Sequence, residues 1–243
     1  MTAIQTIDLT KEFRHRTAVN SLNLSIEKGE FFALLGQNGA GKTTTIKMLT
    51  CLLPPTSGDA LLLGDSINKH PEAVKRKINV SPQETAVAPN LTVKENLELM
   101  ARIYGKTKRE AKATAIDMMS AFGLSERAVD KAKTLSGGMQ RRLSIAMALI
   151  SDPDIVFLDE PTLGLDVRAR RELWKHIFEL KGKVTIILTT HYLEEAEALS
   201  DKIGIMHEGK LQALGTAEEL QRATGQATLE DSFLALTEEE VMS

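Results

Sequence analysis

The sequence predicts an α/β fold in which helices cover a buried, mainly parallel sheet and a helical lobe is inserted into the chain. Two observations support this prediction. Short, continuously apolar strands such as FFALL (31–35), IVFL (155–158) and VTIIL (184–188) need cover on both faces. Between the first of these strands and the other two, from about residue 85 to 150, apolar residues recur at helical spacing.

The first third of the chain is predicted to contain strands, turns and one helix. Leu22, Leu24 and Ile26 alternate as one strand, and Lys28-Gly29-Glu30 ends it. After the strand 31–35 and a glycine-rich loop, we expect a helix from Lys42 to about Leu49. Further short strands are expected in DALLLG (59–64) and KINVS (77–81).

The inserted lobe and the remaining elements follow in order. Thr92 and Glu95 have the spacing of a capping box at the start of a helix. After the lobe, the strands 155–160 and 184–190 flank a helix around 168–180, and 202–214 is expected to form a hairpin that turns at Glu208-Gly209. Helices are expected from Thr216 and Thr228, the second with Leu229, Phe233 and Leu236 on one face.

Composition excludes several classes of protein. Among 243 residues, 30 are basic and 33 acidic, so a net charge of -3 gives no electrostatic reason to expect a nucleic-acid partner. The single cysteine, Cys51, cannot form an internal disulfide and is interpreted as a small buried residue. The N-terminus has no apolar signal core and the apolar runs are too short to cross a bilayer, so we expect a soluble cytoplasmic chain.

The segment GQNGAGKT (36–43) has the pattern of a phosphate-binding loop. A buried strand precedes it and a helix follows, and its glycines let successive backbone amides point at phosphate oxygens. Lys42 is expected to reach the β- and γ-phosphates, and the Thr43 hydroxyl to bind Mg²⁺. The residues predicted to bind the nucleotide here are Gly36, Gln37, Asn38, Gly39, Ala40, Gly41, Lys42, Thr43 and Thr44.

Three other strands end in polar residues. Because successive strand residues face opposite ways, Asp159 can turn toward Mg²⁺ and Glu160 toward the water that attacks the γ-phosphate. The alternative for Asp159 and Glu160 is that they belong to a solvated acidic loop or cap the following helix. Gln83 could touch Mg²⁺ or water, or be an ordinary surface residue; His191 could be catalytic, or simply a hydrogen-bonded structural residue.

The stretch LSGGMQRRLSIAMALI (135–150) has an unusual start for a helix. Ser136 is a suitable cap, but Gly137 and Gly138 lower helix propensity by roughly 1 kcal/mol each relative to Ala. The segment contains no nucleophile or metal ligand that would explain a bare backbone. Its apolar residues share one helical face: Met139, Leu143, Ala146, Met147 and Ile150.

Taken together, these segments resemble the ATP-binding subunit of ABC transporters over almost the whole chain. Walker A (36–43), the glutamine loop at Gln83, the signature LSGGM (135–139), Walker B (155–160), the D-loop LGLD (163–166) and the switch histidine His191 occur in the family's order. The resemblance implies a P-loop NTPase (RecA-like) core with an antiparallel β subdomain and an inserted α-helical subdomain. Within a single domain over 1–243, it assigns residues 1–84 and 153–215 to the core, 85–152 to the helical subdomain and 216–243 to a helical tail.

The resemblance also implies how ATP is bound. Two copies would dimerise head to tail, so that Ser136, Gly137 and Gly138 of one copy approach the γ-phosphate held by the other. By the same resemblance, Glu160 would polarise the attacking water and His191 would contact the γ-phosphate. Phe13 would stack on adenine, with core packing as the alternative, and Asp166 would help to couple the two sites.

Some positions depart from the family pattern. Met139 stands where the signature usually has Gln, and Phe13 where Tyr is commoner, so stacking is retained without a hydroxyl contact. Leu163 and Val167 replace a small residue and a proline of the D-loop. These two changes leave hydrolysis intact and weaken the inference about coupling between sites.

The sequences of 136–150 and of the tail TLEDSFLALT (228–237) resemble those of ABC exporters that extrude sodium or daunorubicin-type drugs. Because the chain has no spanning segment, separate membrane subunits would dock near Glu84 to Tyr104 and hold it at the cytoplasmic face of the membrane. The alternatives are a soluble ABC ATPase acting on ribosomes, DNA or an assembly machine, and a P-loop kinase. A kinase needs an acceptor site and has no use for LSGGM.

Overall fold

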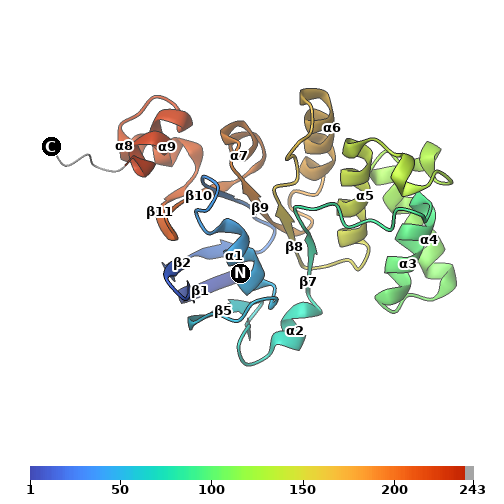
Figure 1. The fold of residues 1–243 in the computed structure, drawn as a ribbon, viewed down its shortest axis with the longest axis horizontal. Coiled ribbons are helices and arrows are strands. Elements are labelled where there is room, and N and C mark those ends of the chain that lie inside the picture. Colours follow the sequence, from blue (N-terminus) through green and yellow to red (C-terminus); the bar gives the residue numbers. More distant parts are fainter. Residues whose placement is uncertain (239–243) are drawn as a thin grey trace.

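A six-stranded sheet lies at the centre of the structure, a computed structural model that describes residues 1–238 (Figure 1). The strand order is β11-β10-β4-β9-β8-β7, and β11 is the antiparallel member. The strands are β4 (Phe31–Leu35), β7 (Ile78–Ser81), β8 (Ile155–Asp159), β9 (Thr185–Thr190), β10 (Lys202–His207) and β11 (Lys210–Gly215). The predicted hairpin turn at Glu208-Gly209 is confirmed.

Both faces of this sheet are covered, as the continuous apolar strands predict. Every residue of β4, β8 and β9 is buried. Phe32 and Leu34 of β4 pack into one core with α1 (Lys42–Leu49) and α2 (Pro71–Lys75). Phe31, Ala33 and Leu35 face the other core, which contains α5 (Gly137–Leu149), α6 (Val167–Phe178) and α7 (Leu193–Leu199).

A second, antiparallel sheet belongs to the first core. It contains β1 (Thr2–Phe13), β2 (Arg16–Leu22), β3 (Ser25–Glu27), β5 (Ser57–Leu62) and β6 (Asp65–Ser66). The prediction of one strand through 22–26 is wrong, because β2 ends at Leu22 and β3 begins at Ser25. Between them, the Asn23 side chain exchanges hydrogen bonds with Asp8, at 2.8 and 2.9 Å, so local side-chain bonding replaces the ladder there.

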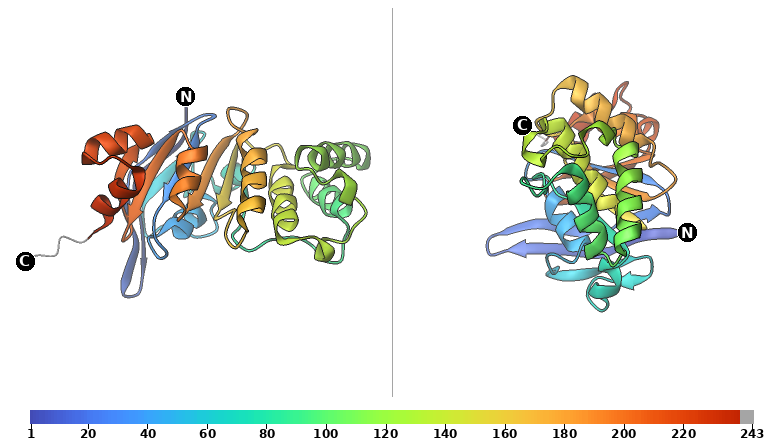
Figure 2. Two further views of the ribbon diagram at one scale, coloured as in Figure 1. Left: turned by 90° about the horizontal axis from the view of Figure 1, so that it is seen from above. Right: turned by 90° about the vertical axis from the view of Figure 1, so that its right-hand side faces the viewer.

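The inserted lobe contains α3 (Val93–Ile103), α4 (Lys108–Ala121) and α5, with short 3₁₀ turns at Ser125–Arg127 and Ala132–Thr134. It forms one end of the molecule, opposite the C-terminal helices (Figure 2). The capping box of Thr92 and Glu95 is confirmed. The expectation of a single apolar face on 135–150 is wrong for the second half of α5, where every residue from Leu143 to Leu149 is buried, because this part lies between the lobe and the sheet.

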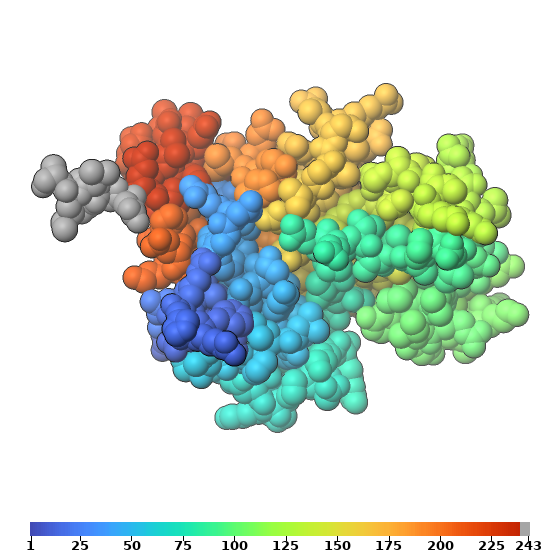
Figure 3. Space-filling model, in the orientation of Figure 1, coloured from blue at the N-terminus to red at the C-terminus, as the bar shows by residue number. Residues whose placement is uncertain are grey.

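The chain ends in α8 (Ala217–Thr224) and α9 (Leu229–Thr237), which pack beside β11 and α7 and form the other end of the molecule (Figure 3). Thr216 and Thr228 cap these helices as predicted, and Leu229 and Phe233 are buried on one face. The last part of the predicted tail, 239–243, lies outside the described residues. The predicted fold class, with its antiparallel β subdomain and helical insert, is confirmed. Within residues 1–238, no helix is long and apolar enough to cross a membrane.

Candidate functional site

Most of the predicted site residues meet at one edge of the six-stranded sheet. Parallel strands β4, β9, β8 and β7 end together, with Leu35 opposite Thr190, Asp159 opposite Thr189, and Ser81 opposite Leu158. The residues that follow these strand ends include Gly36, His191, Glu160 and Gln83. The carboxyl edge of a parallel sheet is where α/β proteins place ligands.

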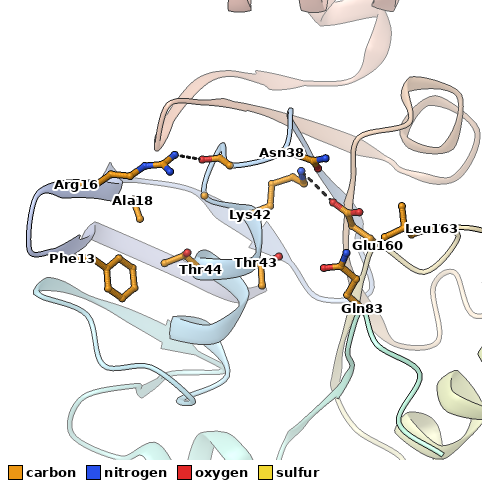
Figure 4. A pocket seen from close by; sticks show the side chains of 12 residues that line it. Phe13, Arg16, Ala18, Asn38, Lys42, Thr43, Thr44, Gln83, Glu160 and Leu163 are labelled. Carbon is orange, nitrogen blue, oxygen red and sulfur yellow. Dashed lines mark hydrogen bonds and ion pairs between the residues drawn. The ribbon is translucent and has the colours of Figure 1, made fainter.

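A cavity of about 480 Å³ opens at this edge (Figure 4), a volume within the range of small-molecule sites. Most of its lining was predicted from the sequence. The predicted residues are Phe13, Asn38, Gly39, Gly41, Lys42, Thr43, Thr44, Gln83 and Glu160; the unpredicted ones are Arg16, Ala18 and Leu163. Of the other loop residues, Gly36 and Ala40 are buried and Gln37 is exposed without lining the cavity.

Glycine is required in the loop itself. Gly39 and Gly41 have φ angles of 86° and 107°, in the region that side chains rarely adopt, and a Cβ on Gly41 would lie 2.3 Å from the Ala18 carbonyl oxygen. Helix α1 begins at Lys42 with no side-chain cap. Its first backbone N–H groups are therefore free of a side-chain acceptor and suit an anion.

The Lys42 ammonium is held inside the loop. It donates to the carbonyl oxygens of Gly36 at 2.7 Å and Gln37 at 3.1 Å, and lies 3.4 Å from Glu160 Oε1. Its side chain is only 5% exposed. Burial lowers the pKa of Lys42, while the neighbouring Glu160 and Asp159 carboxylates oppose that shift. A buried cation that protein groups only partly neutralise suits a polyphosphate ligand.

Glu160 lies at the centre of the predicted polar residues. Its Oε2 lies 3.2 Å from His191 Nδ1, and its side chain is 8% exposed. The residue has a φ of 44°, a costly conformation for a residue other than glycine. Its backbone N–H donates to both the carbonyl and the hydroxyl oxygen of Thr189, at 3.1 Å each. The alternative of a solvated acidic loop for 159–160 is therefore wrong, since both carboxylates are buried.

Asp159 and Thr43 form the candidate metal position. Thr43 Oγ1 donates to Asp159 Oδ1 at 3.2 Å, and Thr189 Oγ1 donates to the same oxygen at 2.5 Å. Within 1–238, no three His, Cys, Asp or Glu residues gather as a metal site, here or elsewhere. One carboxylate and one hydroxyl fit Mg²⁺, which keeps waters and phosphate oxygens as its other ligands. The Gln83 side chain lines the same cavity and lies near Glu160 in Figure 4.

Four predicted residues lie away from this cavity in the same chain. Ser136 and Gly137 are exposed at the start of α5, where Ser136 Oγ accepts a hydrogen bond from Met139 N at 3.3 Å. A Cβ on Gly138 would lie 3.0 Å from Ala169 Cβ, so packing of α5 on α6 restricts this position as well. Asp166 caps α6 by accepting from Ala169 N at 2.9 Å.

Phe13 lies at the open side of the cavity. It is 46% exposed, so the alternative that it packs in the core is wrong. Arg16 lies close by on β2 and donates to the Gly39 carbonyl oxygen at 2.7 Å. Arg16 was not predicted as a site residue, although a basic residue that closely follows an aromatic one and precedes a phosphate loop is a usable signal.

Arg141 was not predicted as a site residue, although it donates four hydrogen bonds in this region. Its guanidinium is 4% exposed and donates to backbone carbonyls beside Gln83 and on both sides of Glu160. Burial lowers the pKa of Arg141 to about 10. The available signal was a charged residue next to the apolar face of 135–150.

Comparisons with known proteins agree with this geometry. The sequence profile of the family described as ABC transporter matches residues 19–163. The chain is 41% identical to the linearmycin resistance ATP-binding protein LnrL of Bacillus subtilis over 227 residues, which cover 93% of this chain and 73% of that protein. It is also 41% identical to the daunorubicin/doxorubicin resistance ATP-binding protein DrrA of Streptomyces peucetius, over 93% of this chain and 69% of that protein.

Solved structures show the same similarity. A structure described as the ATP-binding subunit of an ABC transporter superposes with a TM-score of 0.86 at 31% identity, covering 98% of this chain and 100% of the other. A bacterial ABC transporter cassette solved as a dimer superposes with a TM-score of 0.79 at 27% identity, covering 88% and 98% of the two chains.

Proposed function

This chain belongs to the ABC transporter family and is an ATPase of that family, and from this premise we propose that it drives export through separate membrane subunits. The observation that supports the catalytic part of the proposal best is that Lys42 and His191 both contact the Glu160 carboxylate at one sheet edge, at 3.4 and 3.2 Å. ATP hydrolysis coupled to transport needs groups that bind the phosphates, a group that orients water, and a surface that contacts the membrane subunits. The candidates in this chain are the phosphate loop, Glu160 and the helical lobe near 84–104.

The phosphate loop, 36–44, would hold the ATP phosphates, with Phe13 against the adenine. Lys42 would exchange its contact with Glu160 for the β- and γ-phosphates, because a polyphosphate carries more negative charge than one carboxylate. Thr43, Asp159 and the Gln83 amide would hold Mg²⁺, which neutralises phosphate charge when it is bound.

Once Lys42 contacts phosphate, the Glu160 carboxylate is free to accept a hydrogen bond from water at the cavity wall. The costly backbone of Glu160 and its two bonds to Thr189 fix where that carboxylate points. His191 lies against the other oxygen of the same carboxylate and would contact the γ-phosphate. In this arrangement Glu160 orients the nucleophile and His191 responds to the presence of the γ-phosphate.

A second copy of the chain would complete each site. Ser136 and Gly137 are exposed, and Ser136 uses its oxygen as an acceptor for Met139 N, so its hydroxyl proton stays available to a phosphate oxygen. These residues do not line the cavity of their own chain. A head-to-tail dimer would bring them to the γ-phosphate of the other copy, with Asp166 near the shared boundary. Dimeric cassettes among the solved structures support this proposal.

The membrane partner would dock on the helical lobe, near 84–104. This segment exposes apolar side chains on α3 and just after it: Ile103 is 65% exposed, and Leu99 and Tyr104 are nearly half exposed. Export is supported by the names of the relatives, which are resistance proteins. We further propose the division into a core (1–84 and 153–215), a helical subdomain (85–152) and a tail (216–243), with the chain peripheral at the cytoplasmic face of the membrane.

Co-purification tests the proposal. The tagged chain, expressed in a cell that also encodes its membrane subunits, should be recovered from detergent-solubilised membranes with a multi-span protein. Recovery with ribosomes instead would favour the soluble alternative. Purified protein should release phosphate from ATP without labelling an acceptor, and a non-hydrolysable ATP analogue should convert it from monomer to dimer in light scattering. A phosphorylated product would favour the kinase alternative.

A further inference from the structure

Arg141 is a buried charge whose acceptors are all backbone carbonyl oxygens. Its Nε donates to Pro161 O and one terminal nitrogen donates to Asp159 O, both at 2.8 Å. The other terminal nitrogen donates to Pro82 O and, at 3.2 Å, to Gln83 O. The side chain lies on α5, whereas its acceptors are the last residue of β8 and residues of the loops that follow β7 and β8.

Packing alone does not account for this residue. Burying a guanidinium is costly, and the cost is offset only when its N–H groups find acceptors. An apolar side chain, such as those of Leu143 and Ile145 on the same helix, would anchor α5 without that cost. What the guanidinium adds is a rigid, planar set of donors that holds separate backbone segments at one distance.

The carbonyls that Arg141 binds include those on both sides of Glu160. Asp159 O precedes this residue and Pro161 O follows it. Glu160 has a φ of 44°, an unfavourable conformation for a residue other than glycine, which persists only when its surroundings enforce it. Together with the bonds from Glu160 N to Thr189, Arg141 supplies that enforcement.

We propose that Arg141 is a positioning residue that fixes the Glu160 carboxylate and the Gln83 loop relative to the signature helix α5. Displacement of α5 is then transmitted to both loops at once. The inference rests on the proposed function, because it takes Glu160 as the residue that orients water.

The position of Arg141 along α5 fits this role. Ser136, at the exposed start of the helix, precedes Arg141 by five residues, a rise of about 7.5 Å in an α-helix. A nucleotide that pulls on the start of α5 therefore moves the guanidinium as part of the same rigid helix. Because hydrogen bonds are directional, a shift of α5 would also move the carbonyl groups on both sides of Glu160 and so change where its carboxylate points.

The test compares Arg141→Lys with Arg142→Lys. Arg142 is the adjacent residue of the same helix, but it donates to Phe122 O at 3.2 Å in the lobe and lies 3.9 Å from Glu172. A lysine at 141 keeps the charge and loses the planar donor set. We expect Arg141→Lys to lower kcat about thirtyfold, with the ATP Kd changed less than about threefold, and Arg142→Lys to keep kcat within about twofold.

A double-mutant cycle separates positioning from a general structural defect. In the Glu160→Gln background, Arg141→Lys should change single-turnover hydrolysis by less than about twofold, because the residue through which it acts is already lost. An equal loss in both backgrounds would overturn the proposal, as would a wild-type kcat in Arg141→Lys. Thermal unfolding of every variant checks folding, and Arg141→Gln, whose amide can still donate to one loop, should fall between wild type and Arg141→Lys.

The same experiment distinguishes failure of the inference from failure of the proposed function. If Glu160→Gln alone leaves turnover unchanged, the proposed role of Glu160 is wrong and the positioning role of Arg141 falls with it. If Glu160→Gln abolishes turnover and Arg141→Lys does not reduce it, only the inference about Arg141 is wrong.

Discussion

Replacing Glu160 with Gln should have two opposite effects on the ATP reaction. The carboxylate lies 3.4 Å from the Lys42 ammonium and 3.2 Å from His191 Nδ1, so it competes with ATP for Lys42 and also serves hydrolysis. The amide keeps the shape and loses the charge. We therefore expect Glu160→Gln to bind ATP more tightly than wild type and to hydrolyse it far more slowly.

The gain in affinity follows from the geometry. Two unit charges 3.4 Å apart interact by about 5 kcal/mol at an effective dielectric constant of about 20. Only the part that ATP binding disrupts counts, since the cavity is open to water and Lys42 keeps its bonds to Gly36 and Gln37. Taking roughly a third of the interaction gives about 1.6 kcal/mol, or an about fifteenfold lower Kd.

The loss of hydrolysis is larger. Removing the group that orients and polarises water should slow turnover at least about a hundredfold, equivalent to about 2.7 kcal/mol in the barrier. The trapped ATP should also hold two copies together, because the group that both copies contact is no longer removed.

Titration with a fluorescent ATP analogue measures the affinity, and single-turnover phosphate release measures hydrolysis. Glu194→Gln is the matched control, because this exposed glutamate lies three residues after His191 and does not line the cavity. It should leave both quantities within about twofold of wild type. Unchanged turnover in Glu160→Gln would remove Glu160 from the mechanism. Weaker ATP binding with slow turnover would refute the competition for Lys42.

Three further predictions test other parts of the structure. A mixture of Lys42→Ala and Ser136→Ala subunits should recover part of the ATPase activity that each lacks alone, since one site of the mixed dimer is intact; phosphate release that stays at background argues against shared sites. Phe13→Ala should weaken ATP binding about tenfold in the same titration and Phe13→Tyr less than about twofold, because the tyrosine ring still stacks; equal Kd values for the two would contradict stacking. Burial raises the pKa of Glu195 above 4.5, so its ionisation destabilises the fold as pH rises from 4.5 through the raised pKa. Glu195→Gln, which can still accept from Trp174 Nε1, should flatten the pH dependence of urea unfolding and raise stability at pH 7, and an unaltered slope would count against this.

The sequence by itself determined the local elements. The strands 31–35, 155–159 and 185–190, the phosphate loop and the capping boxes are specified by spacing over fewer than ten residues, where hydrogen bonds and side-chain direction repeat regularly. One error, a continuous strand through 22–26, arose where Asn23 bonds to the distant Asp8 instead of continuing the ladder. The alternation of apolar residues in the sequence cannot predict this contact between Asn23 and Asp8.

Only the tertiary structure decided which groups meet. The strands follow the chain order β4, β7, β8, β9 but lie in the sheet as β4-β9-β8-β7, and this reordering brings Glu160 between Lys42 and His191. It also allows Arg141 to bind carbonyls up to 59 residues away in sequence, a contact that no local pattern encodes. Local hydrogen bonds follow from residue spacing, whereas contacts between distant segments depend on how the sheet and helices pack, because burial acts on surfaces that exist only after folding.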